Sequence, residues 1–165
     1  MVAAPAESFN NRKDVLNLLF GFRGRIDRQW WWLASISIIA LQLALGDPAG
    51  NYRSPDATDL SFWPSLIDDI VATSLNWFNW ALFWPVVALD VKRWHDLGAP
   101  GIMAVLTQGY QPAAWLVGGL GLGGLGETVN AADAAVLTLL GTNLFATLYI
   151  ALAPGQRGAN AYGLG

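Results

Sequence analysis

The sequence contains no cysteine and only one histidine, His95. Disulfide bonds and thiolate metal sites are therefore excluded, and so is a conventional metal site built from several histidines. Charge is also scarce, because 13% of the 165 residues are Asp, Glu, Lys or Arg, against about a quarter in an ordinary soluble domain. With a net charge of −3 and no run of basic residues, the chain offers no surface for nucleic acid.

Apolar residues make up 54% of the chain and gather in long segments without Asp, Glu, Lys or Arg. A helix that crosses the hydrocarbon core of a bilayer needs about 20 such residues. A soluble core helix rarely stays uncharged for so long, because one of its faces meets water. The pattern therefore predicts an all-α membrane protein that forms a single domain. Its four transmembrane helices are expected over residues 29–45, 70–89, 102–125 and 134–153.

Basic residues lie almost entirely on one side of this four-helix arrangement. Eight of the nine fall before the first helix, between the second and third, or after the fourth, and Arg53 alone falls elsewhere. Lys and Arg are enriched in cytoplasmic loops. We therefore expect both termini in the cytoplasm, with residues 46–69 forming an acidic outer loop and residues 154–165 a cytoplasmic tail.

Residues 1–28 precede the first predicted membrane helix and are more polar. Within them, Val15, Leu18, Leu19 and Phe22 recur at helical spacing. This spacing predicts an amphipathic helix that lies along the membrane surface, and a loosely ordered tail is the alternative. The segment lacks the apolar core of a secretory signal, so we expect it to be retained.

Three short motifs follow one another along the chain. They read "FRGRIDRQWWW" over residues 22–32, "KRWHDLG" over 92–98 and "PGQRGANAYG" over 154–163. In this order they resemble the family of bacterial inner-membrane proteins known as domain of unknown function 805. The resemblance implies a four-helix protein of the bacterial inner (cytoplasmic) membrane, and it implies no established activity.

All three motifs fall on the predicted cytoplasmic side, where their polar side chains predict a hydrogen-bonded cluster that ties helix ends together. Arginine suits such a cluster, because its planar guanidinium binds a carboxylate or a phosphate with two bonds. Contact with lipid headgroups is the alternative role. The predicted cluster residues are Arg25, Arg28, Arg93, His95, Asp96, Asn160 and Tyr162. A His–Asp pair without a nucleophile is weak evidence for an enzyme, so we expect no catalytic residue, metal or cofactor.

Small and amide side chains inside the apolar segments predict contacts between helices. Gly119 and Gly123 form a G-x-x-x-G pair, which lets helix backbones approach closely within the bundle or in a dimer. The amides of Asn76, Asn79 and Asn143 are expected to bond between helices. Charged side chains are absent from the segments, which argues against a proton-driven transporter.

Three tryptophans recur along the second segment. Trp77, Trp80 and Trp84 stand at i, i+3 and i+7, which places their indoles on one helix face. This face favours core packing, and a surface that receives another membrane protein, a pigment or a lipid tail is the alternative.

Together these features favour a non-enzymatic structural or accessory subunit of a larger membrane complex, of respiratory or photosynthetic type. Its expected partners are membrane lipid and other integral membrane proteins or a second copy of the chain. Two alternatives stay open. One is an oligomeric channel or exporter for small solutes, with a polar path lined by Asn76, Asn79, Gln108 and Asn143. The other is a lipid- or quinone-binding membrane enzyme, with its ligand beside His95.

Overall fold

The computed structural model describes residues 11–45, 77–122 and 130–163. In these residues the chain is helical, and it contains no β-strand beyond an isolated bridge between Asn160 and Gly163. The predicted all-α class is confirmed. The helices are α1 (Asn11–Phe20), α2 (Arg28–Leu45), α4 (Trp77–Asp96), η1 (Gly101–Met103), α5 (Ala104–Gln108), α6 (Tyr110–Gly119) and α7 (Ala131–Leu152).

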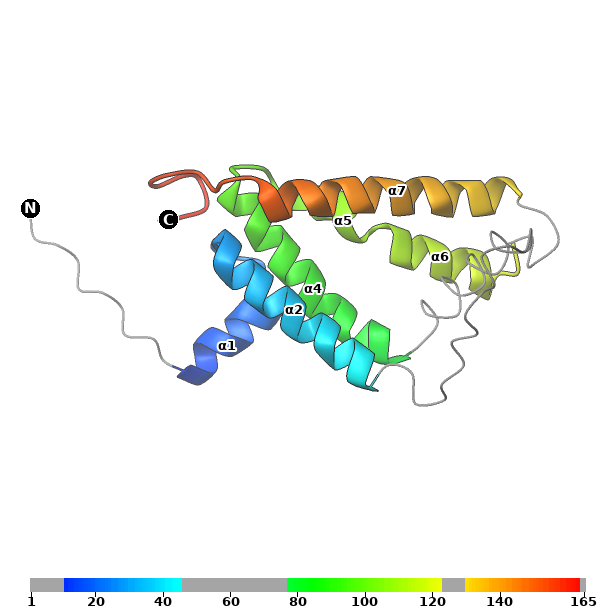
Figure 1. Cartoon of the computed structure of the whole chain (residues 1–165), viewed down its shortest axis with the longest axis horizontal. Helices are drawn as coiled ribbons and strands as arrows, with labels where there is room; N and C mark the ends of the chain where they lie inside the picture. The colour runs from blue at the N-terminus through cyan, green and yellow to red at the C-terminus, as the bar shows by residue number, and fades with distance from the viewer. Residues whose placement is uncertain (1–10, 46–76, 123–129, 164–165) are drawn as a thin grey trace, which may run out of the picture.

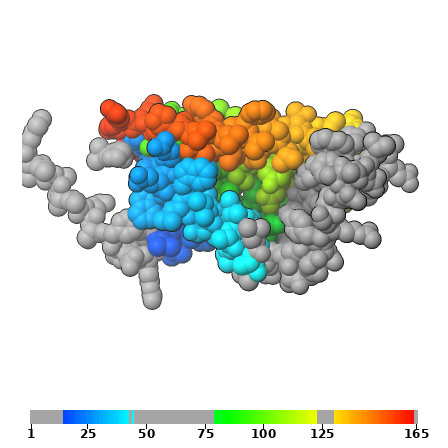
Figure 2. All heavy atoms as spheres, in the orientation of Figure 1, coloured from blue at the N-terminus to red at the C-terminus, as the bar shows by residue number. Residues whose placement is uncertain are grey.

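The helices form two groups that meet at one end (Figure 1). In one group, α4 packs against α1 and α2, and in the other α7 runs along α5 and α6. The groups meet where α4 ends, and α2 and α7 diverge from this junction. The space-filling view shows α2 beside the carboxyl-terminal part of α7 on one face (Figure 2). The main buried apolar cluster consists of Ile26, Trp31, Ile38, Leu89, Val91, Trp94, Ala104, Ile150 and Ala151.

Side-chain caps fix where two of the helices begin. The Asp27 carboxylate accepts a hydrogen bond from the Trp30 amide at 2.8 Å, directly before the first turn of α2. α7 starts with a capping box. The Asn130 side chain accepts from the main-chain N–H of Asp133 at 3.1 Å, and the Asp133 carboxylate accepts from the main-chain N–H of Asn130 at 3.0 Å. The prediction began this helix at residue 134 because Asp133 is charged, yet its carboxylate belongs to the cap.

α4 continues to Asp96, whereas the prediction ended the second helix at residue 89. The added turns are rich in charge, which normally marks the end of an apolar segment. Here the charged side chains are buried, and each has hydrogen-bonding partners on other segments, so the helix can continue. The buried polar residues of these turns are Asp90, Lys92, Arg93, His95 and Asp96.

The third predicted helix, residues 102–125, is interrupted in the structure. η1, α5 and α6 replace it over the described part, and Gly109 separates α5 from α6. Pro112 explains the interruption, because it has no N–H to donate to the Gln108 carbonyl four residues earlier.

Within the described residues, α7 alone is long and apolar enough to cross a bilayer. It has 22 residues, and its most apolar stretch of 18 residues has a mean hydropathy of 1.8. One membrane-spanning helix is thus compatible with the structure, whereas the four-span topology stays a prediction.

Candidate functional site

Two arginines converge on the carboxylate of Asp96, the last residue of α4. Arg25 donates to Oδ1 from Nε at 3.2 Å and from Nη2 at 2.8 Å. Arg93 donates from Nη1 to the other oxygen, Oδ2. The Asp96 side chain is 7% exposed and that of Arg93 is fully buried. A single carboxylate thus faces two guanidinium groups, and these three residues keep a net positive charge.

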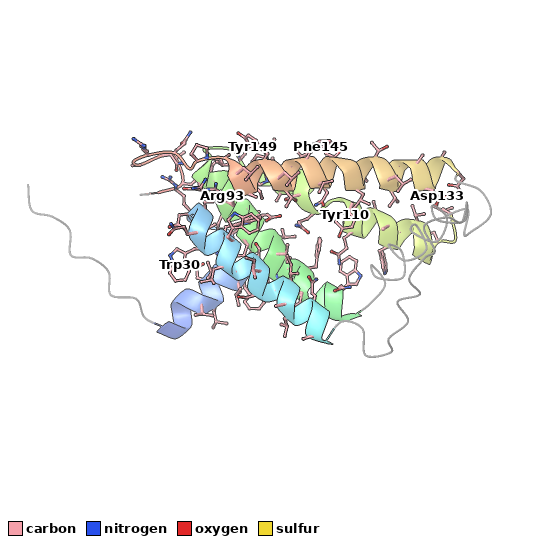
Figure 3. The ribbon with its side chains drawn as sticks, viewed as in Figure 1. Trp30, Arg93, Tyr110, Asp133, Phe145 and Tyr149 are labelled. Carbon is pink, nitrogen blue, oxygen red and sulfur yellow. The ribbon has the colours of Figure 1, made fainter. Side chains whose placement is uncertain are left out.

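The remaining donors of the arginines bind main-chain carbonyls near the end of α7. Arg93 donates from Nε to Ile150 at 2.8 Å and from Nη2 to Ala153. Arg28 donates to Leu152 at 3.3 Å. The last carbonyls of a helix lack partners within it and carry partial negative charge. Three hydrogen bonds from two arginines therefore attach the end of α7 to α2 and α4, and Figure 3 shows Arg93 at this junction.

Burial lowers the pKa of Arg93, and the neighbouring Asp96 carboxylate raises it in opposition. Arginine nevertheless stays protonated in proteins. The guanidinium groups at this junction are therefore always positively charged. Among the described residues, the carboxylate that pairs with them is that of Asp96.

Residues 154–163, which we call the C-terminal loop, close over the arginine–aspartate pair. Arg25 donates from Nη2 to the Gln156 carbonyl and from Nη1 to the Gly158 carbonyl, both at 2.6 Å. In return, the main-chain N–H of Gln156 donates to the main-chain carbonyl of Asp96 at 2.9 Å. The three sequence motifs, far apart along the chain, therefore meet at one carboxylate.

His95 anchors the far end of the C-terminal loop. Its imidazole stacks on the ring of Tyr162, with centroids 3.9 Å apart and planes 5° apart. The Asn160 side chain donates to the His95 carbonyl at 2.8 Å and accepts from the Tyr162 amide at 2.9 Å. His95 Nδ1 lies 3.1 Å from the Gly24 carbonyl. Because a carbonyl only accepts, Nδ1 carries the hydrogen of this bond.

The glycines of the second and third motifs allow these segments to approach closely. A Cβ on Gly155 would overlap the Asp96 carboxylate. Gly98 has a φ of +77°, and a Cβ there would overlap the side chain of Gln156. Any larger residue at position 155 would push the C-terminal loop away from Asp96, so these glycines belong to the architecture of the site.

The structure brings the predicted cluster residues together around the end of α4. These are Arg25, Arg28, Arg93, His95, Asp96, Asn160 and Tyr162. The arginine side chains of this set bind Asp96 or main-chain carbonyls, Asn160 binds the His95 carbonyl, and the Tyr162 ring stacks on His95. Within the described residues, no three His, Cys, Asp or Glu side chains come together as metal ligands.

The residues predicted to pack helices lie in separate places. Gln42 on α2 donates to the Asn79 side chain on α4 at 3.2 Å, and Asn143 on α7 donates to the Thr107 carbonyl on α5. Apart from its chain neighbours and the backbone of its own helix, no described atom lies within 4 Å of the point where a Cβ on Gly119 would stand. Asn76 and Gly123 lie outside the described residues.

The described indoles of the predicted tryptophan face contact different helices. Trp80 meets Trp115 of α6 edge to face, with ring centroids 5.8 Å apart. Trp84 instead donates to the Phe20 carbonyl at the end of α1, at 3.2 Å, and half of its surface is exposed. The side chain of Trp77 is not among those described.

On α4, two buried charged residues were not predicted as site residues. Asp90 accepts from Trp31 Nε1 on α2 at 3.0 Å and from Gln108 Nε2 on α5 at 2.7 Å. Lys92 donates to the carbonyls of Asn17 and Leu18 near the end of α1. Burial lowers the pKa of Lys92 to about 8. One feature of the sequence could have indicated that these residues are buried. Asp90 and Arg93 are three positions apart, which places both on one side of a helix that continues past residue 89.

Comparison with known proteins identifies a family and no individual relative. No curated protein and no solved structure matches the sequence. The family model described as "Protein of unknown function (DUF805)" matches residues 19–164, a range that contains all three motifs. The resemblance inferred from the motifs is thereby confirmed, and the chain belongs to the DUF805 family of proteins of unknown function.

Proposed function

We propose that the chain is a multi-pass membrane protein that acts as a non-enzymatic structural or accessory subunit of a larger membrane assembly. The observation that carries this proposal is the surface of α7. Only 17% of the most apolar stretch of this 22-residue helix is buried. An apolar core helix of a soluble protein would face the interior. α7 instead turns its apolar side chains outward, where lipid or a membrane partner would cover them.

The exposed apolar surface extends beyond α7. On α2, Leu33, Ile36 and Ile39 recur at a spacing of three and are each more than half exposed. On α7, Phe145 is 76% exposed and lies on the outer side of the helix (Figure 3). Scattered exposed apolar residues are ordinary on soluble proteins. Outward stripes on two helices support contact with the hydrocarbon core of a bilayer.

The arginine–aspartate cluster supports a structural role at one end of the bundle. Its guanidinium and carboxylate groups bind each other and main-chain carbonyls, so the cluster holds α2, α4, α7 and the C-terminal loop together. The distribution of Lys and Arg supports a cytoplasmic position for this end. The amides of Asn79 and Asn143 bind neighbouring helices, which favours packing over a solute path for these two residues.

The proposed location is the bacterial inner membrane, with four spans and both termini in the cytoplasm. This part of the proposal rests on the apolar segments, the charge distribution and the family resemblance. The proposed partners are membrane lipid together with other integral membrane proteins, in an assembly of respiratory or photosynthetic type, or a second copy of the chain.

The topology can be tested by cysteine labelling, because the native chain has no cysteine. Ser54→Cys places a single thiol in the predicted outer loop, and Ala159→Cys places one in the C-terminal loop. We expect a membrane-impermeant maleimide to label the first variant in spheroplasts, and to label the second only after the membrane is opened. Labelling of both in intact spheroplasts would contradict the four-span topology, and release of the protein by alkaline carbonate would contradict membrane integration.

The accessory role can be tested by extraction from native membranes in mild detergent, followed by size separation and mass spectrometry. We expect the chain to co-migrate with the same membrane proteins at a fixed stoichiometry. Migration as a monomer or a small homo-oligomer would contradict the accessory role and leave the membrane topology unaffected.

A further inference from the structure

We propose that Asp90 is a proton-binding site, which the folded chain holds as a neutral carboxylic acid at the junction of α2, α4 and α5. This inference is independent of any accessory role, since it concerns the chemistry of one buried group. The cluster around Asp96 has a structural role. Asp90 would differ from it in binding a ligand, the proton.

Burial without a counter-charge is the first argument. Asp90 is 2% exposed. Its cationic neighbours along α4 are engaged elsewhere, Lys92 with carbonyls of α1 and Arg93 with Asp96. Among the described residues, the ion pairs involve Asp96 and not Asp90. An ionised carboxylate buried without a cation is far less stable than the neutral acid.

The neutral character of the groups that bind the carboxyl group is the second argument. Trp31 and Gln108 each donate an N–H to one of the two oxygens. Burial raises the pKa of the Asp90 carboxyl group and is the largest effect on it, whereas the hydrogen bonds from Thr107, Gln108 and Trp31 lower it. None of these partners carries a positive charge, so the neutral acid is the more stable form of this buried group.

Among the described residues, no titratable group on α4 or the helices around it forms an ion pair with Asp90. The described part of α5 and the short η1 contain none, and α6 contributes only Tyr110. On α2 the charged residue is Arg28, which binds Leu152. The other titratable residues of the packed helices are Arg12, Lys13 and Asp14 on α1, Lys92, Arg93, His95 and Asp96 on α4, and Asp133 and Tyr149 on α7.

Loss of this proton would leave an anion buried between three helices. The folded chain therefore binds the proton more tightly than the unfolded chain, in which Asp ionises near pH 4. Stability then falls as pH rises from about 4 through the range in which the folded Asp90 ionises. Asp90→Asn has nearly the same shape, accepts through its carbonyl oxygen, donates through its amide and does not ionise, so it removes this dependence.

The test is infrared difference spectroscopy of the purified full-length protein in detergent. We expect the wild type at pH 7 to show the carbonyl stretching band of a protonated carboxyl group, and Asp90→Asn to lack it. Asp27→Asn is the matched control, because Asp27 is exposed, and it should keep the band. Absence of the band from the wild type, or its persistence in Asp90→Asn, would overturn the proposal.

A second measurement needs no folded variant. The carboxyl band of the wild type should disappear as pH is raised, with the protein melting at lower temperature over the same pH range. If sodium ions at constant ionic strength and fixed pH remove the band while raising the melting temperature, the occupant is a metal ion and the proton assignment is overturned.

Discussion

At the scale of single residues, Asp96 and Asp27 differ in the number and charge of the groups that they bind. Asp96 faces two guanidinium groups and accepts from both, whereas Asp27 caps the exposed start of α2 with one hydrogen bond. Both are aspartates near a helix end, so they form a natural pair for comparison. The difference between them is the buried charge of Arg93, which has no other carboxylate within ion-pair distance among the described residues.

We expect Asp96→Asn to destabilise the folded protein by about 3–5 kcal/mol, because it leaves the buried Arg93 without a counter-charge. Asp27→Asn should change stability by less than about 1 kcal/mol, because Asn is as good a helix cap as Asp. Denaturant unfolding of both variants in the same detergent measures the difference. Equal losses in the two variants would show that the Arg93–Asp96 pair contributes little.

The cluster residues could be predicted from sequence, but their pairing could not. The motifs and the charge distribution place Arg25, Asp96 and Asn160 at one end of the chain's bundle. Nothing in the sequence indicates that Arg93 would donate to the carbonyls of Ile150 and Ala153, because those bonds depend on where α7 ends relative to α4. Main-chain acceptors carry no residue signature, so such contacts appear only in the folded structure.

At the scale of elements, α1 is held against α4 by a buried lysine. Lys92 is 3% exposed and donates to two carbonyls near the end of α1. Trp84 donates to a third carbonyl there, that of Phe20, at 3.2 Å. The predicted amphipathic helix over the amino-terminal segment is thus docked through its carboxyl-terminal end, by donors that both come from α4.

The burial of Lys92 makes the free energy of unfolding depend on pH. Burial lowers the pKa of Lys92 from 10.5 to about 8, so between these values the unfolded chain binds more protons at this position than the folded chain. Stability contributed by Lys92 therefore rises with pH from about 8 to about 10.5. We expect the difference in melting temperature between wild type and Lys92→Met to grow in the wild type's favour over this range. Parallel curves for the two proteins would contradict this.

The helix boundaries show where prediction from charge succeeds and where it fails. α2 starts at Arg28, one residue before the predicted start, because solvent-exposed charge and a cap coincide there. α4 passes the predicted end at residue 89, because its charges are satisfied inside the bundle. Asp90 was missed for the same reason, since a charged residue at the border of an apolar segment is read as facing water.

At the scale of the whole molecule, the outward apolar surface determines the medium in which the chain is stable. If α7 faces lipid, a charge on its outer side has to be brought into the hydrocarbon layer. If α7 instead faces water, the same charge would be harmless or would improve solubility. One exposed position on α7 therefore separates the two situations.

We expect Phe145→Arg to make the free energy of inserting α7 into the membrane less favourable by about 2.5–3.5 kcal/mol, which is the cost of an arginine at the centre of a membrane helix. Phe145→Leu should insert like the wild type. The inserted fraction can be measured from maleimide protection of Ala159→Cys in each background. Unchanged insertion of Phe145→Arg would indicate that this side of α7 is not in contact with lipid.

The hydrogen bond between Arg25 and the Gly158 carbonyl joins residues 133 positions apart in the sequence, and the ion pair with Asp96 spans 71. Contacts between such distant residues form slowly, because the intervening chain loses its freedom before any bond is gained. The helices can form early from local hydrogen bonds, but the cluster can close only when α2, α4 and α7 are all in place. Closure of the cluster is therefore the expected final and rate-limiting event in the maturation of the protein.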